Sequence, residues 1–171
     1  MSKLITCLWF ANNNGEEAVK YYLDTFNSAP GEHVAKLGDV TKSPKSSEAV
    51  SGRPEGSVLT VECEIDGVNF MFLNGGSVEQ FKLNGAASFI VECETQAEID
   101  FFWDKLSAVS EAEQCGWCTD KFGVTWQVVP RILDELMRES PQKSEAVTAA
   151  FMPMKKLDLE TIKKAGEQAT N

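Results

Sequence analysis

The sequence has little of the residue chemistry on which many catalytic and metal sites depend. Its 171 residues include one histidine, His33, and no run approaches the roughly 18 apolar residues that a membrane-spanning helix requires. Its 16 basic residues are outnumbered by 26 acidic ones, so the formal net charge is −10. Since every phosphate contact must neutralise negative charge, we expect neither nucleic-acid nor anionic-membrane partners.

The sequence also lacks an export signal and a disulfide framework. Its first ten residues, MSKLITCLWF, carry no small-residue cleavage site, and five cysteines are scattered without framework spacing. We therefore expect reduced thiols and a cytoplasmic location.

Two of the cysteines, Cys115 and Cys118, form a C-x-x-C pair within EQCGWCTDKFGVTWQVVP. The pair has three possible interpretations: a redox centre, half of a zinc site, or a strand that happens to carry two thiols. Residues three apart on a strand point to opposite faces, which makes a disulfide awkward, and a zinc site needs two more clustered ligands. A thiol redox function is therefore the lesser alternative.

Hydrophobic residues make up 43% of the sequence, which is typical of a globular protein. The sequence pattern divides into two similar halves. The first half predicts a strand at 4–10 and a helix whose capping box is Asn14 with Glu17. It then predicts a mobile loop, Gly38–Ser57, rich in Ser, Pro, Gly and Lys, and a hairpin around Asp66-Gly67.

The second half repeats this order. It predicts a strand over Ala87–Cys93, a helix capped by Thr95 and Glu98, and then the strands QCGWCT and VTWQVV. Beyond Pro130 the pattern becomes helical, with Ser140-Pro141 as a helix start.

This repetition predicts an α+β fold with paired β-α-β-β-β modules. The modules span about 1–80 and 84–131 and form one domain, 1–131, followed by a helical C-terminal extension, 132–171. Cys7 aligns with Ser88, and Tyr22 with Trp103, although shared element order could arise without duplication.

Alternation along the strands predicts which side chains leave the helix-covered face. The large aromatics Phe70, Phe72 and Trp126 suit the helix side. The opposite face would line a mixed, mostly apolar pocket, typical of small-molecule sites, or would form a plain packed core. The predicted lining is Cys7, Trp9, Asn69, Met71, Leu73, Ser88, Ile90, Thr125 and Gln127.

Several segments resemble the PhnB-like proteins along nearly the whole chain. They are ITCLWFANNNGEEAVKYYLDTF, VLTVECEIDGVNFMFLNGG, FKLNGAASFIVECETQAEIDFFWDKLS, QCGWCTDKFGVTWQVVPRIL and AFMPMKKLDLETIKKA. These proteins are a branch of the vicinal-oxygen-chelate superfamily, with glyoxalase I, extradiol dioxygenases and bleomycin-resistance proteins, and often carry the label 3-demethylubiquinone-9 3-methyltransferase. The resemblance implies the glyoxalase/bleomycin-resistance fold and a homodimer.

The same resemblance implies a degenerate metal site. Metal-using members hold a divalent ion with His, Glu or Gln at positions that match Cys7, Met71, Ser88 and Gln127, of which only Gln127 suits such an ion. We therefore predict no metal and no cofactor. S-adenosylmethionine binding is also not predicted, because no glycine-rich turn opens a helix in a G-x-G-x-x-G frame. Gly85 departs from the family, where an acidic residue is common.

Together these observations predict a PhnB-like protein that binds or sequesters a small apolar or aromatic ligand. The alternative is an enzyme of the superfamily, a lyase, dioxygenase or the labelled methyltransferase, with a noncanonical site. The ligand, any reaction and the role of the 38–57 loop stay open. The extension, with Phe151, Met152, Met154 and Leu157, packs either across a dimer or on its own subunit.

Overall fold

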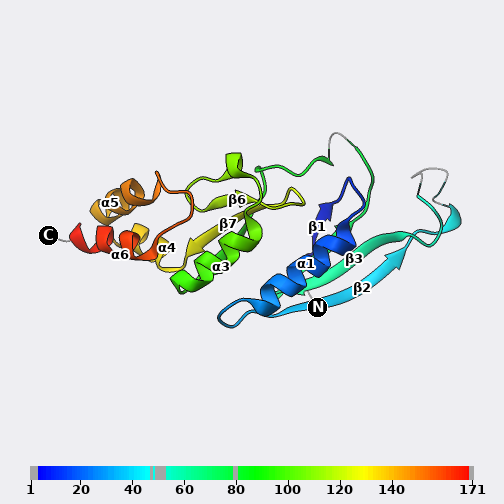
Figure 1. Cartoon of the computed structure of the whole chain (residues 1–171), viewed down its shortest axis with the longest axis horizontal. Helices are drawn as coiled ribbons and strands as arrows, with labels where there is room; N and C mark the ends of the chain where they lie inside the picture. The colour runs from blue at the N-terminus through cyan, green and yellow to red at the C-terminus, as the bar shows by residue number, and fades with distance from the viewer. Residues whose placement is uncertain (1–3, 47, 49–52, 79–80, 170–171) are drawn as a thin grey trace. The chain divides into compact units, whose positions relative to one another are not determined.

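The computed structural model describes residues 4–46, 48, 53–78 and 81–169 and divides into two compact units, Met1–Leu83 and Asn84–Asn171. Each unit combines one small sheet with helices, which confirms the predicted α+β class (Figure 1). The division groups the C-terminal helices with the second module.

The first unit is a β-α-β-β-β module. Its elements are β1 (Thr6–Trp9), α1 (Gly15–Ser28), β2 (Ala35–Lys42), β3 (Val58–Ile65) and β4 (Val68–Leu73). The sheet has the order β1-β4-β3-β2, with β1 parallel to β4 and the other pairs antiparallel. Helix α1 therefore connects β1 to β2 at the opposite edge of the sheet, and the chain returns through β3 so that β4 pairs with β1.

Helix α1 covers one face of this sheet, and the core lies between them. Tyr22 of α1 contacts Phe72 of β4 at 5.8 Å between ring centroids, and Phe72 contacts Phe10 at 5.1 Å. Leu8 and Val61 are also buried on this side. The alternation in β1 and β4 thus correctly predicted the helix-covered face.

The predicted capping box at the start of α1 is wrong. Asn14 is the N-cap residue, but its side chain accepts no capping hydrogen bond. The backbone N–H of Gly15, in the first turn of the helix, instead donates to Asn74 Oδ1 at 2.8 Å. Asn74 lies just beyond β4. A long-range partner replaces the local cap, which local spacing cannot predict.

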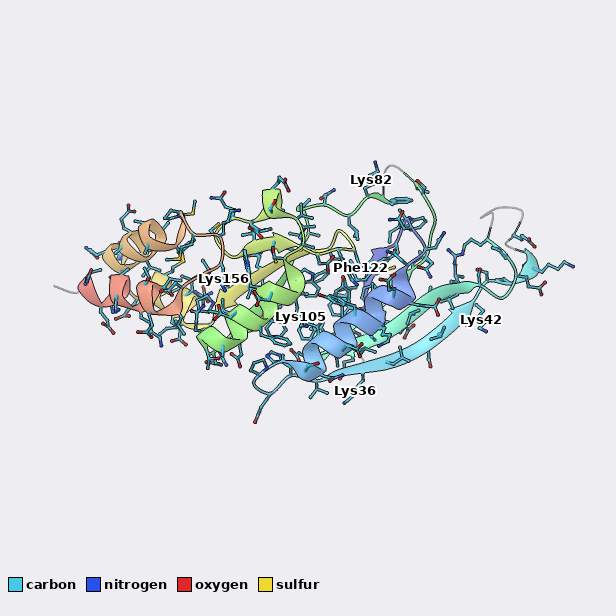
Figure 2. The ribbon with its side chains drawn as sticks, in the orientation of Figure 1. Lys36, Lys42, Lys82, Lys105, Phe122 and Lys156 are labelled. Carbon is cyan, nitrogen blue, oxygen red and sulfur yellow. The ribbon has the colours of Figure 1, made fainter. Side chains whose placement is uncertain are left out.

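Strand β2 occupies the first part of the predicted 38–57 loop, so that prediction is wrong for Gly38 to Lys42. A register irregularity interrupts its pairing with β3 between Leu37 and Val40. Exposed lysines, Lys36 and Lys42, lie near the two ends of this edge strand (Figure 2), and bulges and charges of this kind discourage further strand pairing. Residues 47 and 49–52 of the predicted loop lie outside the described residues.

The second unit begins with the same topology. Strand β5 (Phe89–Cys93) leads into α3 (Gln96–Leu106), and β6 (Trp117–Thr119) and β7 (Thr125–Pro130) follow. The sheet order is β5-β7-β6, with β5 parallel to β7 and β6 antiparallel to it. The predicted Thr95 capping box at the start of α3 is confirmed.

Over residues 84–169 this sheet has three strands, so the predicted β-α-β-β-β module lacks one strand here. The connection after α3 contains a short 3-10 helix, η2 (Ser110–Ala112), and a hydrogen bond from Ala108 N to Thr119 O at 2.9 Å. The intervening AVSEAEQ has no run of alternating apolar residues, so it offers no face to bury as a strand.

The turn before β6 corrects the prediction of a strand over QCGWCT. Cys115 and Gly116 both have positive φ, 40° and 86°, and the strand starts only at Trp117. The following hairpin is organised by buried Asp120. Its carboxylate accepts hydrogen bonds from the backbone N–H groups of Phe122 and Val124 and from the Trp126 indole.

The C-terminal extension forms α4 (Ile132–Glu139), α5 (Pro141–Phe151) and α6 (Leu159–Gln168). The predicted helix start at Ser140 is confirmed, because its side chain accepts from Lys143 N at 3.2 Å. A small core of Val147, Leu157 and Ile162 holds these helices together, with partly buried neighbours such as Val129, Leu133 and Leu136.

The segment before α6 packs on its own unit. Gln96 of α3 donates to Leu157 O and accepts from Leu159 N, at 3.2 and 2.8 Å. The Cys115-Gly116 turn donates two backbone hydrogen bonds to the same segment. The segment before α6 therefore binds its own unit, and packing of the extension across a dimer stays a prediction. No described helix combines the length and apolarity needed to cross a membrane.

Candidate functional site

The face of the first sheet opposite α1 carries the predicted residues of the first unit. Cys7 is exposed, and Trp9, Asn69, Met71 and Leu73 are half-buried. Asn69 also borders a cavity of about 260 Å³. These side chains are more accessible than the helix-side aromatics of the same strands, as alternation predicted.

Strand register brings two of the ligand-position residues together. Cys7 of β1 is the Cα partner of Met71 in β4, and Met71 is in turn the partner of Glu62 in β3. The row therefore presents a thiol, a thioether and a carboxylate. Although Cys7 as a residue is exposed, partial desolvation of its thiol raises the pKa above the ordinary value of 9.0, so the thiol stays protonated at neutral pH. A protonated thiol and a thioether are poor ligands for a hard or borderline ion.

Trp9 lies at the end of this open face, in the same row as Leu73. Its indole N–H donates to Gly76 O at 2.8 Å, and its ring lies 4.7 Å from the Phe81 ring, centroid to centroid. A Cβ atom on Gly75 would lie 2.1 Å from Trp9 Cζ2, so only glycine lets the backbone approach the indole this closely. The Trp9 indole occupies the space that a side chain at position 75 would need, which explains the glycine there.

In the second unit the structure joins the other two ligand positions. Gln127 Nε2 donates to Ser88 Oγ at 2.9 Å, with both side chains partly buried. Trp117 is the register partner of Gln127 in β6, and Ile90 is its partner in β5 with 59% of its surface exposed. Thr125 differs from the other predicted lining residues because it is buried. The result is an apolar surface with one amide–hydroxyl pair.

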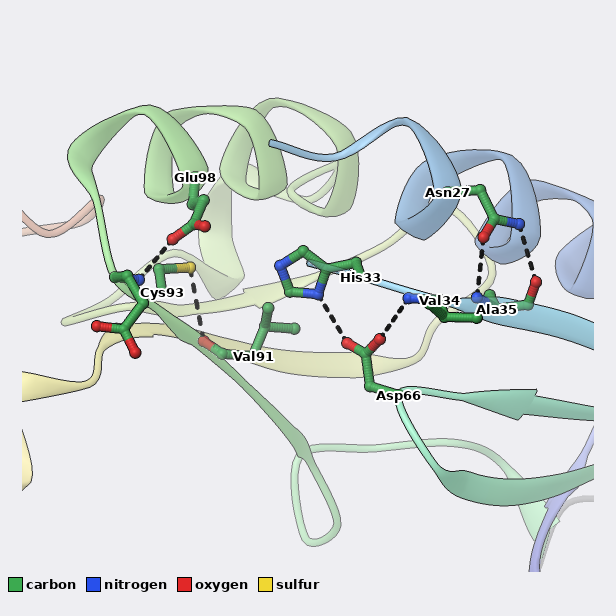
Figure 3. Close-up of polar contacts among 9 residues, drawn as sticks. Asn27, His33, Val34, Ala35, Asp66, Val91, Cys93 and Glu98 are labelled. Atoms are coloured by element: carbon green, nitrogen blue, oxygen red, sulfur yellow. Dashed lines mark hydrogen bonds and ion pairs between the residues drawn. The ribbon is translucent and has the colours of Figure 1, made fainter. Parts of the chain in front are cut away.

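The single histidine has a structural role in the first unit. His33 Nδ1 lies 2.7 Å from Asp66 Oδ2, while Asp66 Oδ1 accepts from Val34 N at 2.8 Å (Figure 3). Asn27 of α1 makes two further hydrogen bonds with the backbone of Ala35 (Figure 3). These contacts attach the loop before β2 to the β3–β4 turn and to α1. Within the described residues, no group of three or more His, Cys, Asp or Glu side chains is placed to hold a metal ion.

The two thiols of the C-x-x-C pair occupy unlike environments. Cys118 is fully buried, and burial raises its pKa to about 12, with Asp120 and Glu113 adding to the effect. Cys115 is half-buried at the positive-φ turn, and burial also raises its pKa. Reactive dithiols instead need an accessible thiol with a lowered pKa, so this geometry disfavours the redox alternative.

A cluster that the sequence did not predict surrounds Arg53, within the region assigned to a mobile loop. The Arg53 guanidinium is buried and donates to Asn13 Oδ1 and to the carbonyl oxygens of Val58 and Asn74. Its Nε donates to Ser43 Oγ at 3.3 Å. A cavity of about 280 Å³ borders the cluster. One arginine among Ser, Pro and Gly gives no sequence signal of burial.

With this geometry in place, comparison with known proteins identifies the family. A family model described as 3-demethylubiquinone-9 3-methyltransferase matches residues 2–129. The chain belongs to this family. No curated protein matches.

Solved structures resemble this PhnB-like chain along most of its length. The PhnB protein of Bacillus cereus is 25% identical, with a TM-score of 0.56 over 75% of this chain and 99% of the other. Protein PA1353 of Pseudomonas aeruginosa is 16% identical, with a TM-score of 0.51 over 76% and 98%. The second similarity concerns the fold alone.

The family description implies methyl transfer, for which S-adenosylmethionine is the usual donor. Gly15 follows β1 and opens α1, but a Cβ there would lie 2.8 Å from Asn74 Oδ1, which fills the space beside the turn. The space beside Gly75 is filled by Trp9. In the described part of the chain, these glycines pack against the protein's own side chains, and the residues do not fit a nucleotide cradle at a helix start.

Proposed function

We propose that this PhnB-like protein binds a small, largely apolar or aromatic molecule on the open faces of its sheets, without a resident divalent metal ion. The observation that carries the proposal is the hydrogen bond between Ser88 and Gln127. Two positions that the family resemblance connects with metal ligation are joined here by a hydrogen bond from the Gln127 amide nitrogen to the Ser88 hydroxyl, beside the exposed side chain of Ile90.

The composition of the faces supports a binding role. The first unit contributes Trp9, Met71 and Leu73, and the second contributes Ile90 and Trp117 around a single amide–hydroxyl pair. Apolar and aromatic surface with a few polar groups is typical of small-molecule sites, where the polar groups fix the ligand's orientation.

Native mass spectrometry of protein purified without denaturation, followed by calorimetric titration with the ligand it carries, tests the proposal. We expect a co-purifying small molecule and, for Gln127→Ala, about two- to tenfold weaker binding, the loss associated with one hydrogen bond. Asp104→Ala, on the exposed surface of α3, serves as the control and should bind as the parent does. Turnover of the carried molecule would favour the enzyme alternative.

Titration of the metal-free protein with Ni, Zn, Mn and Fe ions tests the second part of the proposal. We expect only weak, non-stoichiometric heats, because Cys7, Met71 and the Ser88–Gln127 pair offer at most one suitable ligand. One tight site per chain would refute it. The homodimer stays a prediction, for which light scattering should give twice the mass of the 18.8 kDa chain.

A further inference from the structure

The indole of Trp9 has two neighbours that are held in different ways. The Gly75-Gly76 backbone is anchored, because Gly76 O accepts from the indole N–H at 2.8 Å and Gly76 N donates to Asn13 Oδ1 at 3.2 Å. Asn13 Oδ1 also accepts from buried Arg53. This side of the Trp9 environment is part of the fixed structure of the first unit.

Phe81 is the more exposed of the two neighbours. Its ring lies 4.7 Å from that of Trp9 with an interplanar angle of 47°, yet half of the Phe81 residue is exposed. Its backbone N–H donates to Val78 O, a bond local to the segment. The ring pair with Trp9 therefore stabilises a side chain that is still half in contact with solvent.

We propose that the Phe81 ring is an internal occupant of an aromatic subsite on Trp9 and competes there with a planar aromatic ligand. This inference rests on the proposed binding function and deepens it, because it names the ligand class and the residue that sets its affinity. A planar aromatic ligand in the place of the Phe81 ring, which lies tilted by 47° to the indole, would also contact Trp9 ring to ring, so binding would displace one ring by another.

The competition sets the size of the expected effect. An aromatic pair contributes an amount equivalent to about two- to tenfold in an equilibrium constant. Removing the Phe81 ring should therefore tighten binding at Trp9 by about that factor. A wall of a binding site would behave in the opposite way, because its removal weakens binding.

Fluorine NMR of full-length protein labelled with 5-fluorotryptophan tests this, with indole as the probe. The four tryptophans give separate signals, and Trp9→Phe assigns the signal of Trp9. We expect Phe81→Ala to lower the indole dissociation constant at the Trp9 signal by about two- to tenfold. Phe81→Leu, which keeps apolar bulk without a ring, should fall between the two proteins.

The control is Phe122→Ala, which removes an aromatic from the β6–β7 loop of the second unit and should leave indole binding unchanged. Equal indole affinity in the parent protein and Phe81→Ala would overturn the competition but not the binding function. Weaker binding to Phe81→Ala would make Phe81 a wall of the site and would also overturn it. No response of the Trp9 signal in any variant, together with no co-purifying ligand, would count against both proposals.

Discussion

The two units place different chemistry on corresponding parallel strand pairs. In the first unit the pair β1–β4 presents Cys7 beside Met71, and in the second Ser88, the residue just before β5, is hydrogen-bonded to Gln127 of β7. The backbone topology of these pairs is the same, whereas the first face is rich in sulfur and aromatic rings and the second carries a hydrogen-bonded polar pair. The difference shows that a repeated fold positions side chains without dictating their chemistry.

The hairpins that support these faces also differ in burial. Asp120 in the second unit is 1% exposed and accepts three hydrogen bonds, whereas the Asp66 side chain in the first is 37% exposed. Asp120→Ala leaves buried N–H donors unsatisfied and should lower the free energy of unfolding by about 3 kcal/mol. Asparagine also adopts positive φ readily, so Asp66→Asn should lower the free energy of unfolding by less than about 1 kcal/mol.

Urea unfolding followed by tryptophan fluorescence measures both changes, with the second unit reported by Trp103, Trp117 and Trp126. Equal losses for the two variants would contradict the assignment of Asp120 as the more important hairpin residue.

Gly75→Ala tests the close approach at Trp9. The added Cβ would lie 2.1 Å from the indole, so the indole or the backbone must shift, and we expect a loss of about 2 kcal/mol in the first unit. Gly85→Ala is the matched control, because nothing lies within 4 Å of its Cβ position. The Trp9 fluorine signal follows unfolding of the first unit, and a Gly75→Ala protein as stable as the control would refute the steric explanation.

The attachment of the extension should weaken in acid. A hydrogen bond from Lys156, and a second from Gln96, lower the pKa of Asp100 from its ordinary value of 3.8. Because the pKa is lower in the folded protein, the carboxylate contributes stability at pH values above 3.8 and loses it as the pH falls through the lowered pKa.

Asp100→Asn should therefore flatten the decline of the urea midpoint between about pH 5 and pH 2. The effect should be small, since this ion pair is largely exposed. Asp39→Asn, on exposed strand β2 of the first unit, removes the same charge and serves as the control. An identical pH profile for the two variants would show that Asp100 does not secure the extension.

The smallest effect concerns the thiols. Burial raises the pKa of Cys63, Cys93 and Cys118 to about 12, whereas Cys7 is exposed and Cys115 half-buried. Native protein at pH 7 should be alkylated slowly by iodoacetamide at the latter two residues alone, and faster as the pH rises. Peptide mass spectrometry measures this. A Cys115–Cys118 disulfide after mild oxidation would restore the redox alternative.

Much of the fold could be predicted because its signals are local. The Thr95 capping box, the Asp66-Gly67 turn and the helix side of Phe72 depend on neighbours within a few residues, and all are confirmed. The Asn14 cap was wrong because Asn74, far along the chain, satisfies the same helix start. Strand prediction failed where most residues are exposed, because the sequence there lacks a regular alternation of apolar and polar residues. Examples are β2 and the residues before β6.

The candidate residues divide in the same way. Alternation correctly predicted that Cys7, Met71 and Gln127 leave the helix-covered faces, because the period of a strand is a local property. Thr125 is buried despite its position in the alternation, and burial of Arg53 had no signal in a segment assigned to a mobile loop.

The sequence by itself determined the fold class, the family, the acidic surface and the poverty of metal ligands, since these follow from composition, periodicity and residue identity. Only the tertiary structure decided that Gln127 donates to Ser88, that the Phe81 ring contacts Trp9, and that the segment before α6 binds Gln96 of its own unit. These contacts join residues far apart in the chain, and their partners are selected by register and packing, which act after local structure has formed.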